Sequence, residues 1–168
     1  MTHELKKIFQ VYESTAKAPL KAVLATVVAL EGSSYRKPGV RMLILENGSM
    51  VGAVSGGCVE KEIVRQAESV FKSGEAKVMT YDGRYRLGCE GILYILLESF
   101  EPKPAAIKRF KENVKNRNAF KIESSYEKKD MVHRNFGSCL IFGEDRFSIH
   151  EAHKSDPAFP IVYSWCRT

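Results

Sequence analysis

The chain has no apolar run that approaches the roughly 20 residues of a membrane-spanning helix. Its first residues, Met1 to Lys7, have neither the apolar core nor the small-residue cleavage site of a secretory signal peptide. These two absences argue against a membrane partner and against secretion. We therefore expect a cytoplasmic protein.

Cysteine is scarce, and no two cysteines form a C-x-x-C pair among Cys58, Cys89, Cys139 and Cys166. No histidine stands at zinc-finger spacing from them, which argues against a closed structural zinc site. Disulfides are disfavoured in a reducing compartment. We expect Cys139, within a predicted strand, and Cys166, near a polar end, to be structural residues.

Two more patterns are missing. The chain has no G-x-G-x-x-G run, so nothing indicates a dinucleotide-binding Rossmann domain. His133, His150 and His153 have no spacing that is typical of a site. The strand predicted around His150 places it and His153 on no common face, so we expect no joint role for these two residues.

Charge of one sign is in modest excess. The 168 residues carry a net charge of +6, and residues 101–168, with 13 basic and 9 acidic side chains, contribute more of it than residues 1–100, with 13 and 11. Such an excess attracts anionic cofactors or acidic partners. The basic residues are interleaved with acidic ones and no nucleic-acid-binding motif is present, so we expect no nucleic-acid partner.

The hydrophobic pattern predicts one α+β domain, in which a mixed β-sheet is packed with helices. Residues 1–100 would form its core, and residues 101–168 a basic linker and an additional αβ layer of the same domain. Asn47-Gly48 predicts a tight hairpin, and Gly74 the end of a helix. The expected helices are 3–15, 58–73 and a short one through Ile107, Phe110 and Val114; the expected strands are 22–29, 40–45, 50–55, 76–81, 92–97, 120–124, 139–142 and 147–150.

Three loops of the chain carry candidate motifs. The second of them along the chain is Ser55-Gly56-Gly57-Cys58-Val59-Glu60, which lies between an apolar strand and an amphipathic helix. A glycine turn at a helix N-terminus points backbone N–H groups at one spot and adds the positive end of the helix dipole, which suits an anion. The same field lowers the pKa of a thiol, so Cys58 is a candidate soft ligand or nucleophile. The alternative is a buried cysteine that merely begins a helix.

Two further loops carry polar side chains between glycines. The first motif, Glu31 to Gly39 with Arg41 just beyond, combines hydroxyls, cations and glycines, which suits a phosphate or carboxylate. The third motif, Tyr81 to Gly91, places Cys89 between glycines directly before a strand, where backbone can approach a ligand closely. In each case a solvated turn or a buried structural cysteine is the alternative.

Taken together, these motifs resemble the XdhC/CoxI family. The resemblance rests on Ala25-Thr26-Val27-Val28 with Gly32 to Met42, on Val54 to Glu60, and on Tyr81-Asp82 with Leu87 to Gly91. It covers about residues 20–99. The family consists of maturation factors for molybdenum hydroxylases such as xanthine dehydrogenase, so the resemblance implies a chaperone that binds the molybdenum cofactor (molybdopterin) and assists its sulfuration and insertion.

The resemblance also implies a cofactor site and partners. The implied partners are a xanthine dehydrogenase-like molybdoenzyme and a cysteine desulfurase, with a homodimer left open. No catalytic residue is expected, and Cys58 would be the molybdenum contact, through bound cofactor. The implied cofactor-binding residues are Ser33, Ser34, Tyr35, Arg36, Arg41, Ser55, Gly56, Gly57, Cys58, Glu60, Asp82, Gly88, Cys89 and Gly91.

The chain departs from the family in two respects. The third motif usually reads Gly-Cys-Gly-Gly, and here Glu90 takes the third position, which adds a negative charge beside Cys89 and should raise the pKa of its thiol. Full-length relatives also carry a C-terminal Rossmann domain, which is absent from this sequence.

Two other classes of function stay open. One is an oxidoreductase accessory domain, which would be cysteine-dependent if Cys58 and Cys89 form a redox pair, or dinucleotide-dependent if a further domain binds a dinucleotide. The other is a scaffold whose basic second part docks an acidic partner. This function predicts that removal of the chain after about residue 100 abolishes partner binding but spares cofactor binding.

Overall fold

The computed structural model describes residues 2–15, 20–33, 37–55, 57–84, 90–151, 153 and 158–166, and for Cys58, Glu90 and Trp165 it describes the backbone alone. Within these ranges the chain forms three helices and ten strands. The helices are α1 (Thr2–Ser14), α2 (Cys58–Ser73) and α3 (Pro104–Lys115). The strands are β1 (Ala22–Ser33), β2 (Arg41–Leu45), β3 (Met50–Gly52), β4 (Lys77–Asp82), β5 (Glu90–Ser99), β6 (Phe120–Ser125), β7 (Met131–Val132), β8 (Gly137–Phe142), β9 (Asp145–Ser148) and β10 (Ile161–Cys166).

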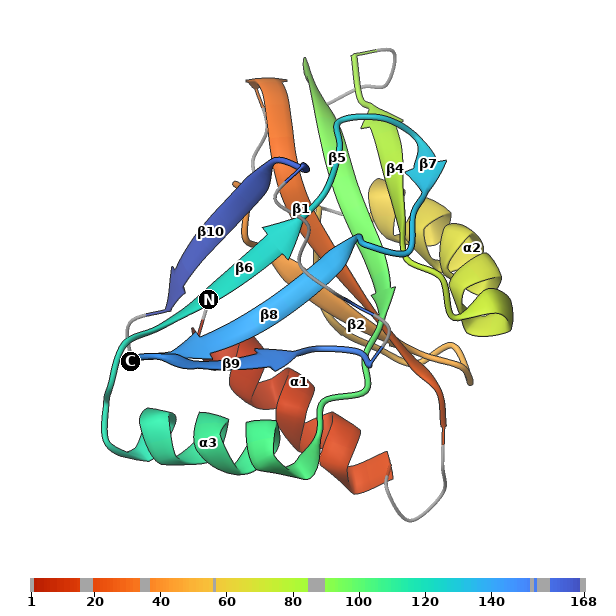
Figure 1. Ribbon diagram of the computed structural model, residues 1–168. Helices are drawn as coiled ribbons and strands as arrows, with labels where there is room; N and C mark the ends of the chain where they lie inside the picture. Colours follow the sequence, from red (N-terminus) through yellow and green to blue (C-terminus); the bar gives the residue numbers. More distant parts are fainter. Residues whose placement is uncertain are drawn as a thin grey trace.

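The strands make two sheets, which Figure 1 shows one in front of the other. Sheet A has six strands in the order β3-β2-β1-β5-β4-β7, and sheet B has four in the order β10-β6-β8-β9. Every pairing between described strands is antiparallel. The central strands β1 and β5 are long and rich in apolar residues, as expected for strands that are covered on both faces.

Sheet A separates two layers of apolar packing because successive side chains of a strand point to opposite faces. On one face Val23, Ala25 and Val27 pack with Ile63 and Ala67 of α2. On the other face the buried residues of sheet A join those of sheet B and of helices α1 and α3 in one cluster, among them Leu24, Leu43, Phe9, Phe110, Phe120, Ile122 and Leu140. Residues before and after position 100 therefore share one core.

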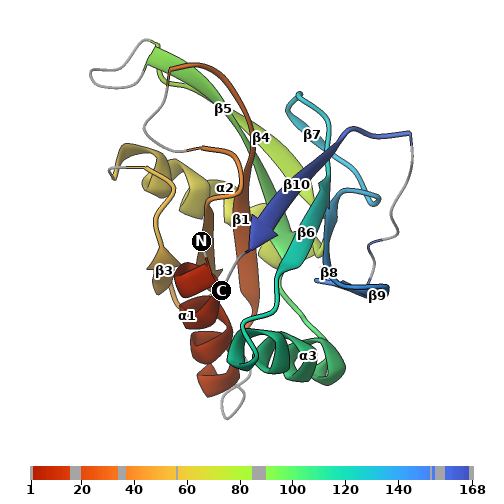
Figure 2. The same ribbon diagram turned by 90° about the vertical axis from the view of Figure 1, so that its left-hand side faces the viewer.

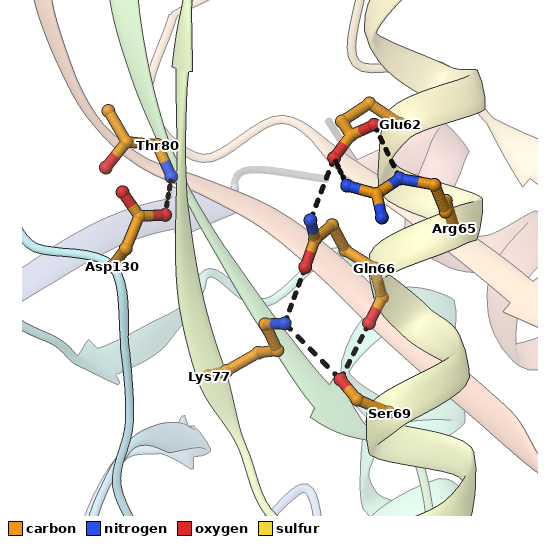
Figure 3. Close-up of polar contacts among 7 residues, drawn as sticks. All are labelled: Glu62, Arg65, Gln66, Ser69, Lys77, Thr80 and Asp130. Carbon is orange, nitrogen blue, oxygen red and sulfur yellow. Dashed lines mark hydrogen bonds and ion pairs between the residues drawn. The ribbon is translucent and has the colours of Figure 1, made fainter.

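Helix α2 is bounded by two glycines in the left-handed conformation, Gly57 with φ 118° and Gly74 with φ 72°. Its polar face is tied to strand β4, as Figure 3 shows. The Lys77 Nζ donates to Gln66 Oε1 at 2.6 Å and to Ser69 Oγ at 3.3 Å, and Gln66 in turn donates to Glu62 Oε1 at 2.8 Å. These contacts fix the direction of α2 on the sheet, and with it the position of the Cys58 end.

A hydrogen bond to Asp130 also stabilises the outer edge of strand β4. The Asp130 carboxylate accepts the Thr80 amide N–H at 2.7 Å (Figure 3). This bond satisfies a backbone donor near the point where the short strand β7 continues the sheet, and so shields an otherwise open edge.

The α+β class with packed helices is confirmed, and so are the predicted helices, hairpin and helix end. Strand β3 is shorter than predicted, because the chain leaves the sheet at Gly52 to enter the second motif. Strands β7 and β10 were not predicted. Their side chains are mostly half-buried or exposed, so the sequence has little of the apolar alternation that marks a strand.

Candidate functional site

Strand pairing brings the first and third motifs together at one end of sheet A. Ser33, the last residue of β1, lies opposite Glu90, the first residue of β5, and Gly32 lies opposite Gly91. The Gly83 amide donates to the Gly91 carbonyl at 3.0 Å, which closes the base of the third motif. Figure 2 shows the end of β1, the end of β4 and the start of β5 together at the top of the molecule.

Gly91 is the residue that permits this approach. A Cβ atom at Gly91 would lie 2.6 Å from the Ser33 carbonyl oxygen and 2.9 Å from that of Glu31. Backbone oxygens cannot move aside as a flexible side chain can. The absence of a side chain at Gly91 therefore serves the contact between the two strands.

The second motif follows the neighbouring strands. The loop before β2 bonds to β1, since Gly39 donates to the Val27 carbonyl at 2.8 Å and Val27 donates to that of Val40 at 3.0 Å. Strand β3 then pairs with β2, with Gly52 opposite Met42, and leads into Ser55. The first motif thus borders the third motif at its beginning and the second motif near its end.

The turn of the second motif already holds an anion, which is the carboxylate of Glu60. Glu60 Oε1 accepts the amides of Val54 at 3.0 Å and Ser55 at 2.5 Å. Its Oε2 accepts the Ser55 hydroxyl at 2.7 Å and the Gly57 amide at 2.9 Å. The amides of Ser55 and Gly57 are therefore engaged within the protein.

Glu60 is only 8% exposed. Burial pushes the pKa of its carboxyl up, but the hydrogen bonds from the Ser55 hydroxyl and from the backbone outweigh it, and the pKa is lowered overall. The carboxylate form is thus the one that fits the turn. Glu60 thus holds the loop that leads into helix α2, which begins at Cys58.

The other members of the predicted site are placed as follows. Ser33 is exposed at the end of β1, Gly57 is exposed, and Cys58 occupies the first position of α2. Asp82 is half-buried at the end of β4 and accepts Arg84 Nε at 2.9 Å, and this contact lowers the pKa of the Asp82 carboxyl. Ser34, Tyr35, Arg36, Gly56, Gly88 and Cys89 lie outside the described residues.

Arg41 lies in the interior, between the two sheets, with 1% of its surface exposed. Its Nη1 donates to the Gly39 carbonyl at 2.7 Å and its Nη2 to the Ser164 hydroxyl of β10 at 3.2 Å. Its Nε has no partner within the described part of the chain. Burial lowers the pKa of the guanidinium, although nearby Cys166 and Glu98 oppose this effect.

Glu98 and two serines of sheet B share this interior with Arg41, and the sequence analysis did not single them out. Glu98 Oε1 accepts the Ser138 hydroxyl at 2.6 Å, its Oε2 accepts the Ser138 amide at 2.8 Å, and the hydroxyls of Ser124 and Ser138 lie 2.7 Å apart. Burial raises the pKa of Glu98. A charged residue directly after an otherwise apolar strand segment, Ile92 to Leu97, is the signal that could have identified it.

The expectation that His150 and His153 lie on no common face is wrong. The rings of His150 and His153 have centroids 5.9 Å apart, and both are buried. The chain leaves strand β9 at Ser148, so the alternation of a strand no longer applies to these two residues. They pack over Gly137, where a Cβ would lie 2.8 Å from the His153 ring. Burial of the imidazole, and to a lesser degree the charge of His150, lower the pKa of His153 to about 4.

The thiols of Cys139 and Cys166 are free and buried, and burial raises the pKa of each. They are thus poor nucleophiles, in agreement with the structural role expected for them. Within the described residues no group of three or more His, Cys, Asp or Glu side chains is arranged to hold a metal ion. No helix in the described ranges is long and apolar enough to cross a membrane.

Residues 16–82 match the XdhC and CoxI family. The resemblance is therefore confirmed over this range, which contains the first and second motifs and the first two residues of the third, Tyr81 and Asp82.

Two relatives and one solved structure are also similar to this chain. A Bacillus subtilis protein described as a probable xanthine dehydrogenase subunit is 36% identical over 86 residues, which are 46% of this chain and 26% of the relative. The molybdenum cofactor insertion chaperone PaoD of Escherichia coli is 38% identical over 60 residues, 36% of this chain and 19% of the relative. A Bacillus halodurans crystal structure, described as a xanthine dehydrogenase, shares the fold, with a TM-score of 0.69 and 24% identity over 92% of this chain and 52% of that one.

Proposed function

We propose that this protein binds the molybdenum cofactor and acts as a chaperone in the maturation of a xanthine dehydrogenase-like molybdenum hydroxylase. The family match over residues 16–82 and the likeness to an insertion chaperone support a maturation role. The matched segments are about a quarter and a fifth of the two relatives, so the activity of the complete relatives enters here as part of the proposal.

The observation that carries the proposal is the register between β1 and β5. Pairing of Ser33 with Glu90 draws the first and third motifs to one end of sheet A, and the β2–β3 hairpin brings the second motif to the neighbouring strands. Ligand sites commonly form where several loops converge at one end of a sheet. The placement of the described parts of the three motifs therefore supports a shared site.

The described residues suit parts of a pterin cofactor. The exposed hydroxyl of Ser33 is a donor for a phosphate, and the Asp82 carboxylate accepts N–H donors such as those of a pterin ring. The bound cofactor would supply a molybdenum centre, for which a cysteine thiolate is a soft ligand, and we assign that contact to Cys58. Ser34, Tyr35, Arg36, Gly56, Gly88 and Cys89 complete the proposed site.

Three residues have a different place in this proposal. Glu60 holds the second motif in shape through its four hydrogen bonds. Arg41 holds the Gly39 carbonyl of the first motif from the interior, and Gly91 lets β1 and β5 approach. We assign them the positioning of the loops, not contact with the cofactor. Sulfuration by a cysteine desulfurase and formation of a homodimer are further parts of the proposal.

The test is the cofactor content of the purified protein. We expect protein expressed in cells that make the cofactor to carry molybdenum, measured by mass spectrometry, and a pterin, measured by fluorescence after oxidation. Protein from cells that lack cofactor synthesis supplies the blank. The Cys58→Ser variant should lose most of the molybdenum, whereas Cys139→Ser, which alters a buried thiol of sheet B, should keep it.

Equal and negligible pterin content in both cell types, in protein shown to be folded, would contradict the proposal. A thiol titration on the same samples separates the competing redox function. Loss of two thiols under mild oxidant in wild type, abolished in Cys58→Ser, would support the oxidoreductase instead.

A further inference from the structure

Helices α1 and α3 lie side by side at the end of the molecule opposite the three motifs, as both Figure 1 and Figure 2 show. Phe9 and Phe110 stack between them with ring centroids 4.1 Å apart. Two hollows open on the outer surface of this helix pair. One, of about 310 Å³, has Phe9, Phe110 and Val114 among its lining residues; the other, of about 440 Å³, includes Tyr12 and Ile107.

The two hollows are parts of one groove. Glu13 of α1 and Lys111 of α3 line both hollows and join in an ion pair of 2.6 Å between them. The apolar residues beneath belong to the core or pack against it, so the floor is rigid. A rigid, apolar floor with a polar rim is the usual form of a surface that receives a peptide.

Charge indicates what kind of peptide the groove fits. Its lining residues include four lysines, Lys6, Lys108, Lys111 and Lys115, and one carboxylate, that of Glu13, which Lys111 already pairs. The side chains of Lys6, Lys108 and Lys115 are exposed. Positive charge around an apolar floor favours a segment with apolar anchors and carboxylates beside them.

The spacing of the hollows indicates the conformation of that segment. Ile107 and Val114 are seven residues apart on α3, one in each hollow. Seven residues rise about 10.5 Å along an α-helix. A second helix that lies along the groove presents its residues i and i+7 at this same interval, with the intervening turn above the Glu13–Lys111 pair.

We propose that the α1–α3 groove is the docking site for an acidic amphipathic helix of a partner protein. This inference goes beyond cofactor binding and does not depend on it. Because the groove lies at the opposite end of the molecule from the three motifs, a docked partner leaves them accessible. The α3 side also shares its core with β1 and β2, so removal of residues after 100 would disrupt the fold and could not test the surface.

The test uses a synthetic probe, a fluorescent peptide of about 15 residues, with leucines at i, i+3, i+4 and i+7 and glutamates on its flanks. We expect it to bind the full chain with micromolar affinity, measured by fluorescence anisotropy, and to bind less tightly as salt rises. The same composition with scattered leucines, and the same leucines flanked by lysines, should bind at least about tenfold more weakly.

Matched variants locate the binding. Lys108→Glu with Lys115→Glu reverses one exposed lysine and one lysine in the last turn of α3. Lys129→Glu with Lys72→Glu reverses an exposed loop lysine and the lysine in the last turn of α2, neither of which lines the groove. The first pair should weaken the probe by about tenfold, and the second should leave its affinity within about twofold. Thermal unfolding of both variants checks that they are folded.

Two results would overturn the proposal. One is equal binding of the ordered and scattered peptides; the other is an unchanged affinity in the folded Lys108→Glu, Lys115→Glu variant. Sedimentation tests a different occupant: if wild type is a dimer and only the groove variant is a monomer, a second copy of the chain fills the groove. Cofactor content, measured separately, is expected to be the same in both double variants.

Discussion

At the scale of single residues, Glu60 is the side chain that most changes the interpretation of the second motif. Helix N-termini often bind an external anion, because their first amides have no partner within the helix. Here the protein's own carboxylate takes the amides of Val54, Ser55 and Gly57. The sequence pattern predicted a site for a ligand anion at this turn, and in the structure the carboxylate of Glu60, in the first turn of the motif's own helix, accepts these amides.

Replacement of Glu60 by Gln should therefore loosen the second motif. An amide group would face N–H and O–H donors with an N–H₂ of its own, and we expect unfolding by urea to show a loss of about 1–3 kcal/mol. The control is Glu62→Gln on the same helix, where the carboxylate accepts from Arg65 at the surface and from Gln66. That change should cost less than about 1 kcal/mol. Equal losses in the two variants would contradict the assignment.

The effect of Glu60 should also depend on pH. Its folded pKa is lower than the value of 4.5 for the free side chain, so the folded protein holds fewer protons than the unfolded chain. Its contribution to stability is complete above pH 4.5 and is lost as the pH falls through the folded pKa. The difference between wild type and Glu60→Gln should be largest near neutral pH and should shrink in acid.

At the scale of elements, the meeting of β1 and β5 at Ser33 and Glu90 determines whether the first and third motifs can share a site. The Gly91→Ala variant tests it, because its Cβ would collide with two carbonyl oxygens of β1. We expect a loss of about 1–3 kcal/mol in stability and faster amide hydrogen exchange at the ends of β1 and β5. Cofactor content should fall as well.

Gly48→Ala is the comparison for Gly91→Ala. Gly48 has φ +85°, and a Cβ added there would meet no atom of the described residues within 4 Å, so any cost is backbone strain in the β2–β3 turn. Exchange at the ends of β1 and β5 should be unaffected. If both variants increase the rate of amide hydrogen exchange at the ends of β1 and β5 equally, the role assigned to Gly91 in the approach of these strands is wrong.

Elements were predictable where the local pattern was strong. Helix α2 shows apolar residues at helical spacing and a glycine at each end, and β1 shows an apolar run from Ala22 to Leu30 that only Thr26 interrupts. The orientation of Arg41 was not predictable from its neighbours in the motif. It stands on the same face of β2 as Leu43 and Leu45, but Met42 and Ile44 on the other face are buried too, so the sequence could not say which face met a second sheet.

The histidine pair and Glu98 escaped prediction for another reason. Their partners come from distant parts of the sequence: Ser138 is 40 residues from Glu98. A one-dimensional pattern contains periodicity and turns but not the packing of one sheet on another. Only the two-sheet arrangement brings the polar residues of β5, β6 and β8 to one interior position.

At the scale of the whole molecule, Arg41 joins the two sheets by its bond to Ser164. Ser164→Ala should destabilise the protein by about 1.5–3 kcal/mol, because it removes a hydrogen bond to a buried charge. In the Arg41→Lys background the same change should cost clearly less, since the bond is then already weakened. Chemical denaturation of the four proteins measures this coupling; additive losses would mean that the two side chains do not interact.

The bond between Arg41 and Ser164 spans 123 positions of the chain, and this has a consequence for the kinetics of folding. Contacts between distant positions close late, and chains rich in them fold over milliseconds to seconds. A ribosome adds about 5–20 residues per second. During synthesis the first hundred residues must therefore wait for several seconds without β10 beside them, with the Arg41 guanidinium not yet enclosed. General chaperones that bind exposed strands can act during this interval, which ends once the segment with Ser164 has been synthesised.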